Sequence, residues 1–171
     1  AWRGPAEGGR AAARARGGSR MQSPVPIEDL ASVPRSGEGG SGVGSGVSAR
    51  PTAEDAWSVA DSRFPASRQG HRMHVMASRT SDSRWHKQLR EIAKDVEGER
   101  GVYWLKPFRT YKTFCPYYVG SYDDVAAELA GMMDLGVSLF VLDIMESEED
   151  FIHMREVFDL ANPMRMSAAM S

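Results

Sequence analysis

The sequence predicts the α/β fold class, and the clearest indications lie in the C-terminal third of the chain. Ser121 stands where a residue would cap a helix, and Gly136 follows where a left-handed residue would end it. The apolar run Ser138–Leu142 comes next, and Ser147 is placed to open a second helix. Helix, short turn, strand and helix in this order are typical of the closing segment of a parallel α/β fold.

Each of these elements carries its own pattern. Asp123 and Asp124 lie in the first turn of the first helix, where acidic groups suit the positive end of the helix dipole. The strand is too apolar to be half exposed, so we expect both of its faces to be buried. The side chains expected on the buried sides of the two helices are Val125, Leu129, Met132 and Met133, then Phe151, Met154 and Phe158.

The first 48 residues have a different composition. Residues 1–20 are mostly Ala, Gly and Arg, and Ser36–Ser48 is nearly all Gly, Ser and Val. Such stretches offer little apolar surface to offset chain ordering, so we expect residues 1–48 to be disordered or irregular. The basic part admits a nucleic-acid arm or an organelle presequence, but it has only Trp2 for stacking and no amphipathic period. Because the first Met is Met21, a truncated or degraded coding start is favoured over both.

The middle of the chain predicts two amphipathic helices. Residues 50–64 have a cap at Thr52, with Ala56, Val59, Ala60 and Phe64 on one face. Residues 83–96 carry Trp85, Leu89 and Ile92 opposite a charged face. The aromatic and apolar segment Val102–Phe108 predicts either a short strand or a packed loop.

Composition and chemistry-bearing residues narrow the function classes. The chain has 42% hydrophobic residues and a net charge of −2, and no apolar run approaches the roughly 18 residues of a membrane span. We therefore expect a cytoplasmic protein with neither membrane nor nucleic acid as a partner. Cys115 is the single cysteine, and no motif gives it a His base, so we expect a packed residue rather than a nucleophile. His71 and His74 have a spacing that suits a metal on a helix face, but no third ligand accompanies them, and no metal site is predicted.

Several short segments, in their order and spacing, resemble the C-terminal part of the bacterial luciferase-like flavin monooxygenases, nearest to the alkanesulfonate monooxygenase-like branch. The resemblance covers residues 49–161, about two thirds of the chain. The matching segments are Ala49–Trp57, Arg79–Ser83, Tyr111–Tyr117, Val119–Ser121 and Leu139–Asp143.

The resemblance implies a C-terminal fragment of a TIM (β/α)8 barrel, preceded by the irregular residues 1–48 and followed by a tail, 162–171. Such enzymes use reduced FMN and dioxygen and often a separate flavin reductase. The implied elements are Val43–Ala49 as strand seven, Thr52–Phe114 as the insertion after it, Ser121–Leu135 as helix seven, Ser138–Asp143 as strand eight and Ser147–Ala161 as helix eight.

Barrel enzymes place their chemistry at the carboxyl ends of the strands and in the loops beyond them. Relatives of this branch carry Arg and His at the end of strand seven, where this chain has Gly44 and Gly46, and a Tyr after strand eight, where it has Ile144. No catalytic residue is therefore assigned. The mobile insertion leaves the cofactor-binding candidates Arg109, Tyr111 and Lys112, whose cations and phenol suit a flavin phosphate or an anionic substrate group. The alternative is that the aromatic residues of this loop simply pack it onto the barrel rim.

Two classes of function remain open at this point. The first is part of an FMN-dependent monooxygenase that acts on a small molecule, with a deazaflavin-dependent oxidoreductase as a variant. The second is a non-catalytic remnant or interaction module. Because the chain has at most two of eight barrel strands, we expect it to bind no flavin tightly, and its exposed strand edges favour homo-oligomers.

Overall fold

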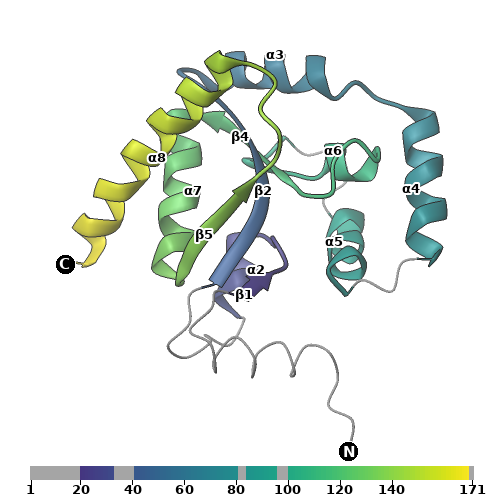
Figure 1. Ribbon diagram of the computed structural model, residues 1–171, viewed down its shortest axis with the longest axis horizontal. Helices are drawn as coiled ribbons and strands as arrows, with labels where there is room; N and C mark the ends of the chain where they lie inside the picture. Colours follow the sequence, from purple (N-terminus) through teal and green to yellow (C-terminus); the bar gives the residue numbers. More distant parts are fainter. Residues whose placement is uncertain (1–19, 33–40, 81–83, 96–99, 170–171) are drawn as a thin grey trace, which may run out of the picture.

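The computed structural model describes residues 20–32, 41–80, 84–95 and 100–169. Within them the chain forms a mixed α/β structure with a curled sheet of five strands (Figure 1). The elements are β1 (Arg20–Gln22), α2 (Ile27–Ala31), β2 (Ser41–Arg50), α3 (Ala53–Arg63), α4 (Arg68–Thr80), α5 (Arg84–Asp95), β3 (Tyr103–Trp104), α6 (Lys106–Arg109), β4 (Tyr117–Ser121), α7 (Tyr122–Asp134), β5 (Val137–Leu142) and α8 (Glu148–Ala169).

The long strand β2 organises the sheet. Its first residues pair in parallel with both β1 and β5, so these two strands lie on opposite edges of β2. Its second half, Gly46–Arg50, pairs in parallel with β4, and the short β3 adds to β4 in the antiparallel sense. The parallel arrangement of β1, β2 and β5, with helices between them, is consistent with part of an α/β barrel.

The caps predicted for α7 are confirmed. Ser121 and Asp124 form a reciprocal capping box, in which each side chain accepts a hydrogen bond from the other residue's backbone N–H. Gly136 has a φ of +93°, a conformation that favours glycine at the end of a helix. These two local signals fix α7 between β4 and β5.

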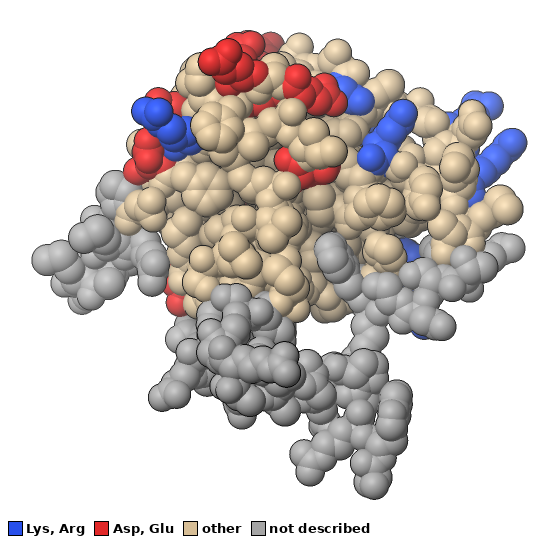
Figure 2. Space-filling model, viewed as in Figure 1, with Lys and Arg blue, Asp and Glu red and all other residues tan. Residues whose placement is uncertain are grey.

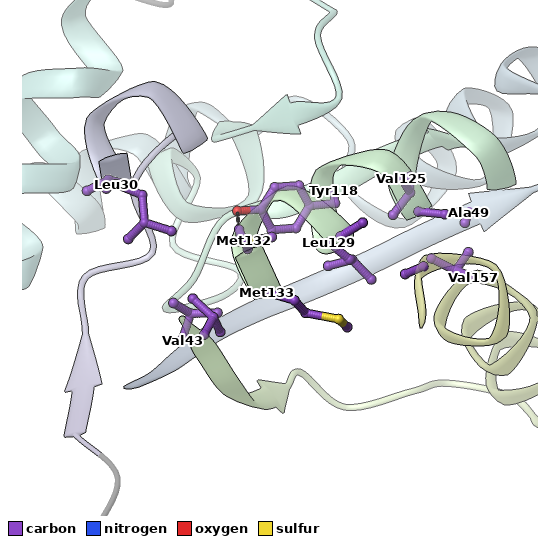
Figure 3. Packing of buried hydrophobic residues seen from close by; sticks show 14 residues of the cluster. Leu30, Val43, Ala49, Tyr118, Val125, Leu129, Met132, Met133 and Val157 are labelled. Atoms are coloured by element: carbon purple, nitrogen blue, oxygen red, sulfur yellow. Dashed lines mark hydrogen bonds between the residues drawn. The ribbon is translucent and has the colours of Figure 1, made fainter. Parts of the chain in front are cut away.

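The main core lies between the sheet and the two helices α7 and α8, which pack side by side (Figures 1 and 3). Leu129 and Val157 are fully buried there, and Tyr118 from β4 packs among them with its hydroxyl near the sulfur of Met132. The predicted buried face of α7 is confirmed, since Val125, Leu129, Met132 and Met133 are all buried.

The prediction that β5 is buried on both faces is wrong. Leu139 is 43% exposed and Val141 is 50% exposed, whereas Phe140 is half-buried against the ring of Phe158. The physical reason is that α7 and α8 cover one face of the strand only. The same correction applies to Phe151 of α8, which is 53% exposed, while the neighbouring Asp150 is buried.

The prediction that residues 1–48 lack regular structure is wrong for β1, α2 and the first part of β2. Residues 1–19 and 33–40 of this stretch lie outside those described. Composition failed here because the apolar cover comes from elsewhere in the chain. A Cβ at Gly42 would lie 2.6 Å from the sulfur of Met21, and one at Gly46 would lie 2.2 Å from the ring of Tyr117. The glycines therefore let neighbouring side chains lie flat on the strand.

The remaining expectations concern the middle and the end of the chain. The cap of α3 is confirmed, because the Thr52 hydroxyl accepts a hydrogen bond from Asp55 N–H, and the helix predicted over 83–96 is α5, with Leu89 fully buried. Segment 102–108 contains both a strand, β3, and the start of a short helix, α6. The tail expected from residue 162 continues α8 as far as Ala169. Among the described residues, none of the helices has the length and hydrophobicity to cross a membrane.

Candidate functional site

The carboxyl ends of β2 and β5 meet the start of α8 at one edge of the sheet. A buried cluster of ionic side chains there connects β2 and α3 to α8. Nη2 of Arg50 donates a hydrogen bond of 2.8 Å to Oδ1 of Asp150, and Arg63 of α3 binds the other carboxylate oxygen. Burial raises the pKa of Asp150, but the hydrogen bonds from Arg50, Arg63 and Ser147 prevail and hold that pKa below its ordinary value. A carboxylate held from both sides in this way is a joint between α3, β2 and α8.

A second polar pair lies at the same edge. The Tyr117 hydroxyl donates a hydrogen bond of 2.9 Å to Oδ2 of Asp143, the residue that follows β5. Burial and this hydrogen bond raise the pKa of Tyr117, so the phenol stays protonated. The ring of Tyr117 covers Gly46. Gly46 is one of the two glycines that stand where the resembling enzymes carry Arg and His.

This tyrosine–aspartate pair was missed as a site by the sequence analysis. The signal that could have found Asp143 is its place directly after a parallel strand, where α/β proteins gather polar side chains. No local signal brings Tyr117 to it, because the contact depends on how β4 pairs with β2.

A cavity of about 440 Å³ lies between the start of α4 and α6, and we call it the cationic pocket. Its lining contains four Lys or Arg side chains and His71. Among the described residues, no Asp or Glu lines it. Figure 2 shows Lys and Arg gathered on the α4 side of the molecule, while Asp and Glu gather over its top. The lining residues are Ala66, Ser67, Arg68, His71, Arg72, Lys106, Arg109 and Thr110.

Of the three predicted cofactor-binding residues, the structure places only one in the cationic pocket. Arg109, at the end of α6, lines the cationic pocket. Tyr111 and Lys112 follow in an exposed turn and are not among its lining residues. Tyr111 has a φ of +57° and its ring meets the edge of Phe114 at 5.9 Å, so in part this loop packs against itself.

The cysteine and the two histidines considered in the sequence analysis are not parts of a metal site among the described residues. Cys115 is buried, and burial raises the pKa of its thiol to about 12, so it is a packed residue, as predicted. His74 lies edge-on to the ring of Phe108 at 4.7 Å, while His71 lines the cationic pocket. Within the described ranges, no three His, Cys, Asp or Glu side chains gather as a metal site.

Comparison with known proteins gives one informative relative. No protein-family model matches the chain. The chain is 37% identical over 119 residues to the 4-(gamma-L-glutamylamino)butanoyl-[BtrI acyl-carrier protein] monooxygenase BtrO of Niallia circulans. The match covers 69% of this chain and 35% of the relative, so the chain spans about a third of the relative's length.

This relative corrects the resemblance drawn from the sequence. The assignment to the alkanesulfonate monooxygenase-like branch of the luciferase-like family is wrong, because the relative's name places its acyl substrate on a carrier protein. The residues of the matching segments have structural roles in the fold and do not indicate a sulfonate substrate. Thr52 caps α3 and Tyr117 packs on β2, whereas Ile144, where that branch has Tyr, is 86% exposed.

Proposed function

We propose that this chain is part of a monooxygenase that oxidises an acyl group held on a carrier protein, with reduced FMN and dioxygen as co-reactants. The observation that carries the proposal is the 37% identity to the BtrO monooxygenase over 119 residues. In this reaction one oxygen atom of dioxygen enters the acyl chain and the other leaves as water. Bound reduced flavin would supply the two electrons that the reaction needs.

The sheet supports a barrel as the scaffold of this activity. The parallel strands β1, β2 and β5 direct their carboxyl ends to one edge, where Asp143 and Tyr117 lie, and α7 and α8 cover one face. We infer that further strands, equivalent to the rest of the relative's length, close a TIM barrel against the other face. The exposed side chains of Leu139 and Val141 would then line its interior.

Among the residues of this chain, the cations of the cationic pocket have the chemistry to bind a phosphate, which FMN and the phosphopantetheine arm of a carrier protein both carry. Arg109 is the predicted lid residue among these cations. The flat ring system needs walls that this partial sheet does not enclose, so the rest of the protein would have to supply them. In this arrangement Arg109, with Tyr111 and Lys112 beside it, would close the site over the cofactor and exclude water.

A non-catalytic remnant is the second candidate. It is favoured by the apolar face of β5, which no described element covers. A remnant would keep the helix–strand–helix packing of α7, β5 and α8 without a complete site.

The deciding experiment replaces the 119 matched residues of the Niallia relative with those of this chain. The chimera is given carrier-bound acyl substrate, a flavin reductase and dioxygen, and the product is weighed by mass spectrometry. Addition of one oxygen atom supports the proposal, and Arg109→Ala should then lower turnover by about tenfold or more with little change in melting temperature. A chimera that folds and binds FMN but leaves the substrate unchanged would favour the remnant. Turnover with a reduced deazaflavin in the absence of dioxygen would instead indicate hydride transfer.

A further inference from the structure

We infer that the cationic pocket is a binding site for a phosphate ester. Arg68 and Arg72 reach it from the first turns of α4, and Lys106 and Arg109 from the two ends of α6. Guanidinium groups bind phosphate oxygens through paired, charge-assisted hydrogen bonds, and an ammonium group adds a point charge. Cations that converge from two helices on one cavity match a compact anion better than an extended acidic surface.

The two walls of the pocket are held at a fixed distance. A Cβ at Gly70 would lie 2.1 Å from the backbone carbonyl oxygen of Thr110, so α4 approaches the end of α6 more closely than any side chain would allow. The ring contact between His74 and Phe108 continues this packing along α4. The cations of the two helices are therefore positioned by backbone packing.

Lys106 is also oriented from behind. Its ammonium group lies 2.9 Å from Oδ1 of Asp61 in α3 and 5.3 Å from the centre of the Trp104 ring. Asp61 offsets part of the charge of Lys106, but Asp61 itself does not line the pocket. The positive field extends to His74, whose pKa is lowered first by burial and then by nearby cations that include Arg109.

The size of the pocket indicates an ester rather than a free ion. A cavity of about 440 Å³ holds a phosphate group with room for the organic group attached to it. Two biochemical sources share this chemistry: the phosphopantetheine arm of a carrier protein and the phosphate of FMN. We expect the arm to be the occupant, and this identification, unlike the phosphate site itself, rests on the proposed function.

Binding to the full chain tests the site without any turnover. Phosphopantetheine and FMN are each titrated by calorimetry beside pantetheine and riboflavin, which differ from them only by the missing phosphate. We expect binding of the phosphorylated member of each pair, weakening as salt is raised, and none of its partner. Arg72→Gln and Arg109→Gln should each weaken binding of phosphopantetheine by about tenfold or more, the loss of one charge-assisted contact.

Matched variants separate the pocket from general charge. Arg155→Gln removes an exposed cation of α8 that does not line the pocket, and it should change the affinity by less than about twofold. Arg72→Lys keeps the charge and should restore part of the affinity. Equal binding of pantetheine and phosphopantetheine, or equal losses in Arg155→Gln and Arg72→Gln, would overturn the site.

The two ligands also separate the sources. FMN that binds about tenfold more tightly than phosphopantetheine would overturn the carrier arm as occupant and assign the pocket to the flavin. Phosphate-dependent binding together with an inactive chimera would leave the site standing while the proposed oxidation fails. The two proposals are therefore decided independently.

Discussion

At the scale of single residues, we expect the largest loss of stability from a change at Asp150. Its carboxylate is buried between Arg50 and Arg63, with side chains that are 9% and 16% exposed. Asp150→Asn would leave the buried Arg50 without its counter-charge and Arg63 with only the exposed carboxylate of Glu146, 3.4 Å away. We expect a loss of about 3–5 kcal/mol in the free energy of unfolding. Urea denaturation measures it, with Asp159→Asn as control.

Asp159 makes an exposed ion pair with Arg155 at 3.7 Å, and its removal should change stability by no more than about 1 kcal/mol. Comparable losses in the two variants would mean that the buried joint contributes no more than a surface pair.

The same joint predicts a pH dependence. Because the pKa of Asp150 is lower in the folded protein than its ordinary value of 3.8, the unfolded chain takes up the proton first as the pH falls. The contribution is complete above about pH 4 and disappears as the pH falls from there through the folded pKa. Unfolding curves from pH 6 to about pH 2 should show this loss in the wild-type protein and a shallower one in Asp150→Asn. Parallel slopes would contradict the assignment.

At the scale of elements, a Leu→Ala change should lower stability more on the covered side of the sheet than on the open side. Leu129 of α7 is fully buried, whereas Leu139 of β5 is 43% exposed. Leu129→Ala should cost about 2–5 kcal/mol through lost burial and the cavity left behind, and Leu139→Ala less than about 1 kcal/mol. Denaturant midpoints compare the two. A large loss at Leu139 would show that some element covers this face in solution.

The packing of α4 on α6 gives a second prediction at this scale. Alanine is favoured over glycine inside a helix by about 1 kcal/mol, but a Cβ at Gly70 meets a backbone carbonyl that cannot move aside. We therefore expect Gly70→Ala to destabilise the protein by about 1–2 kcal/mol and to weaken phosphopantetheine binding. Gly101→Ala is the control, since its Cβ would lie 3.8 Å from the nearest atom, an ordinary contact. Unchanged binding in Gly70→Ala would mean that the helix spacing does not shape the pocket.

The elements also show how far the sequence can be taken. The ends of α3 and α7 were predicted because capping by Thr52 and Ser121 is a local interaction between near neighbours. The faces of β5 were not predicted, because they depend on which helices cover the sheet. Composition also missed β2, whose cover comes from Met21 and Tyr117. The strand over Val43–Ala49 was implied by the family resemblance alone, and β2 confirms it. Among the proposed site residues, Arg109 was found in its basic, aromatic loop, but the partners that complete its pocket come from α4, 37 to 41 positions earlier.

At the scale of the whole molecule, the open face of the sheet predicts self-association. Leu139 and Val141 are exposed on β5, and an uncovered apolar face next to strand edges favours pairing between chains. We expect concentration-dependent self-association in gel filtration, reduced in the double variant Leu139→Lys, Val141→Lys. Ile152→Lys, at a residue of α8 that is 55% exposed, is the matched control and should not alter it. A wild-type chain that stays monomeric at high concentration would show that this face is covered.

The same open architecture limits what the isolated chain can do with a flavin. A tight flavin site encloses both the phosphate and the ring, and this chain offers a cationic pocket for the first but only a partial sheet for the second. FMN should therefore bind with a dissociation constant of about 0.1 mM or weaker, through its phosphate alone. Flavin fluorescence titrations with FMN and riboflavin measure this, and the chain should not speed the oxidation of reduced FMN over buffer. Micromolar affinity for both flavins would mean that the ring has a site of its own in this chain, and that further strands are not needed to build it.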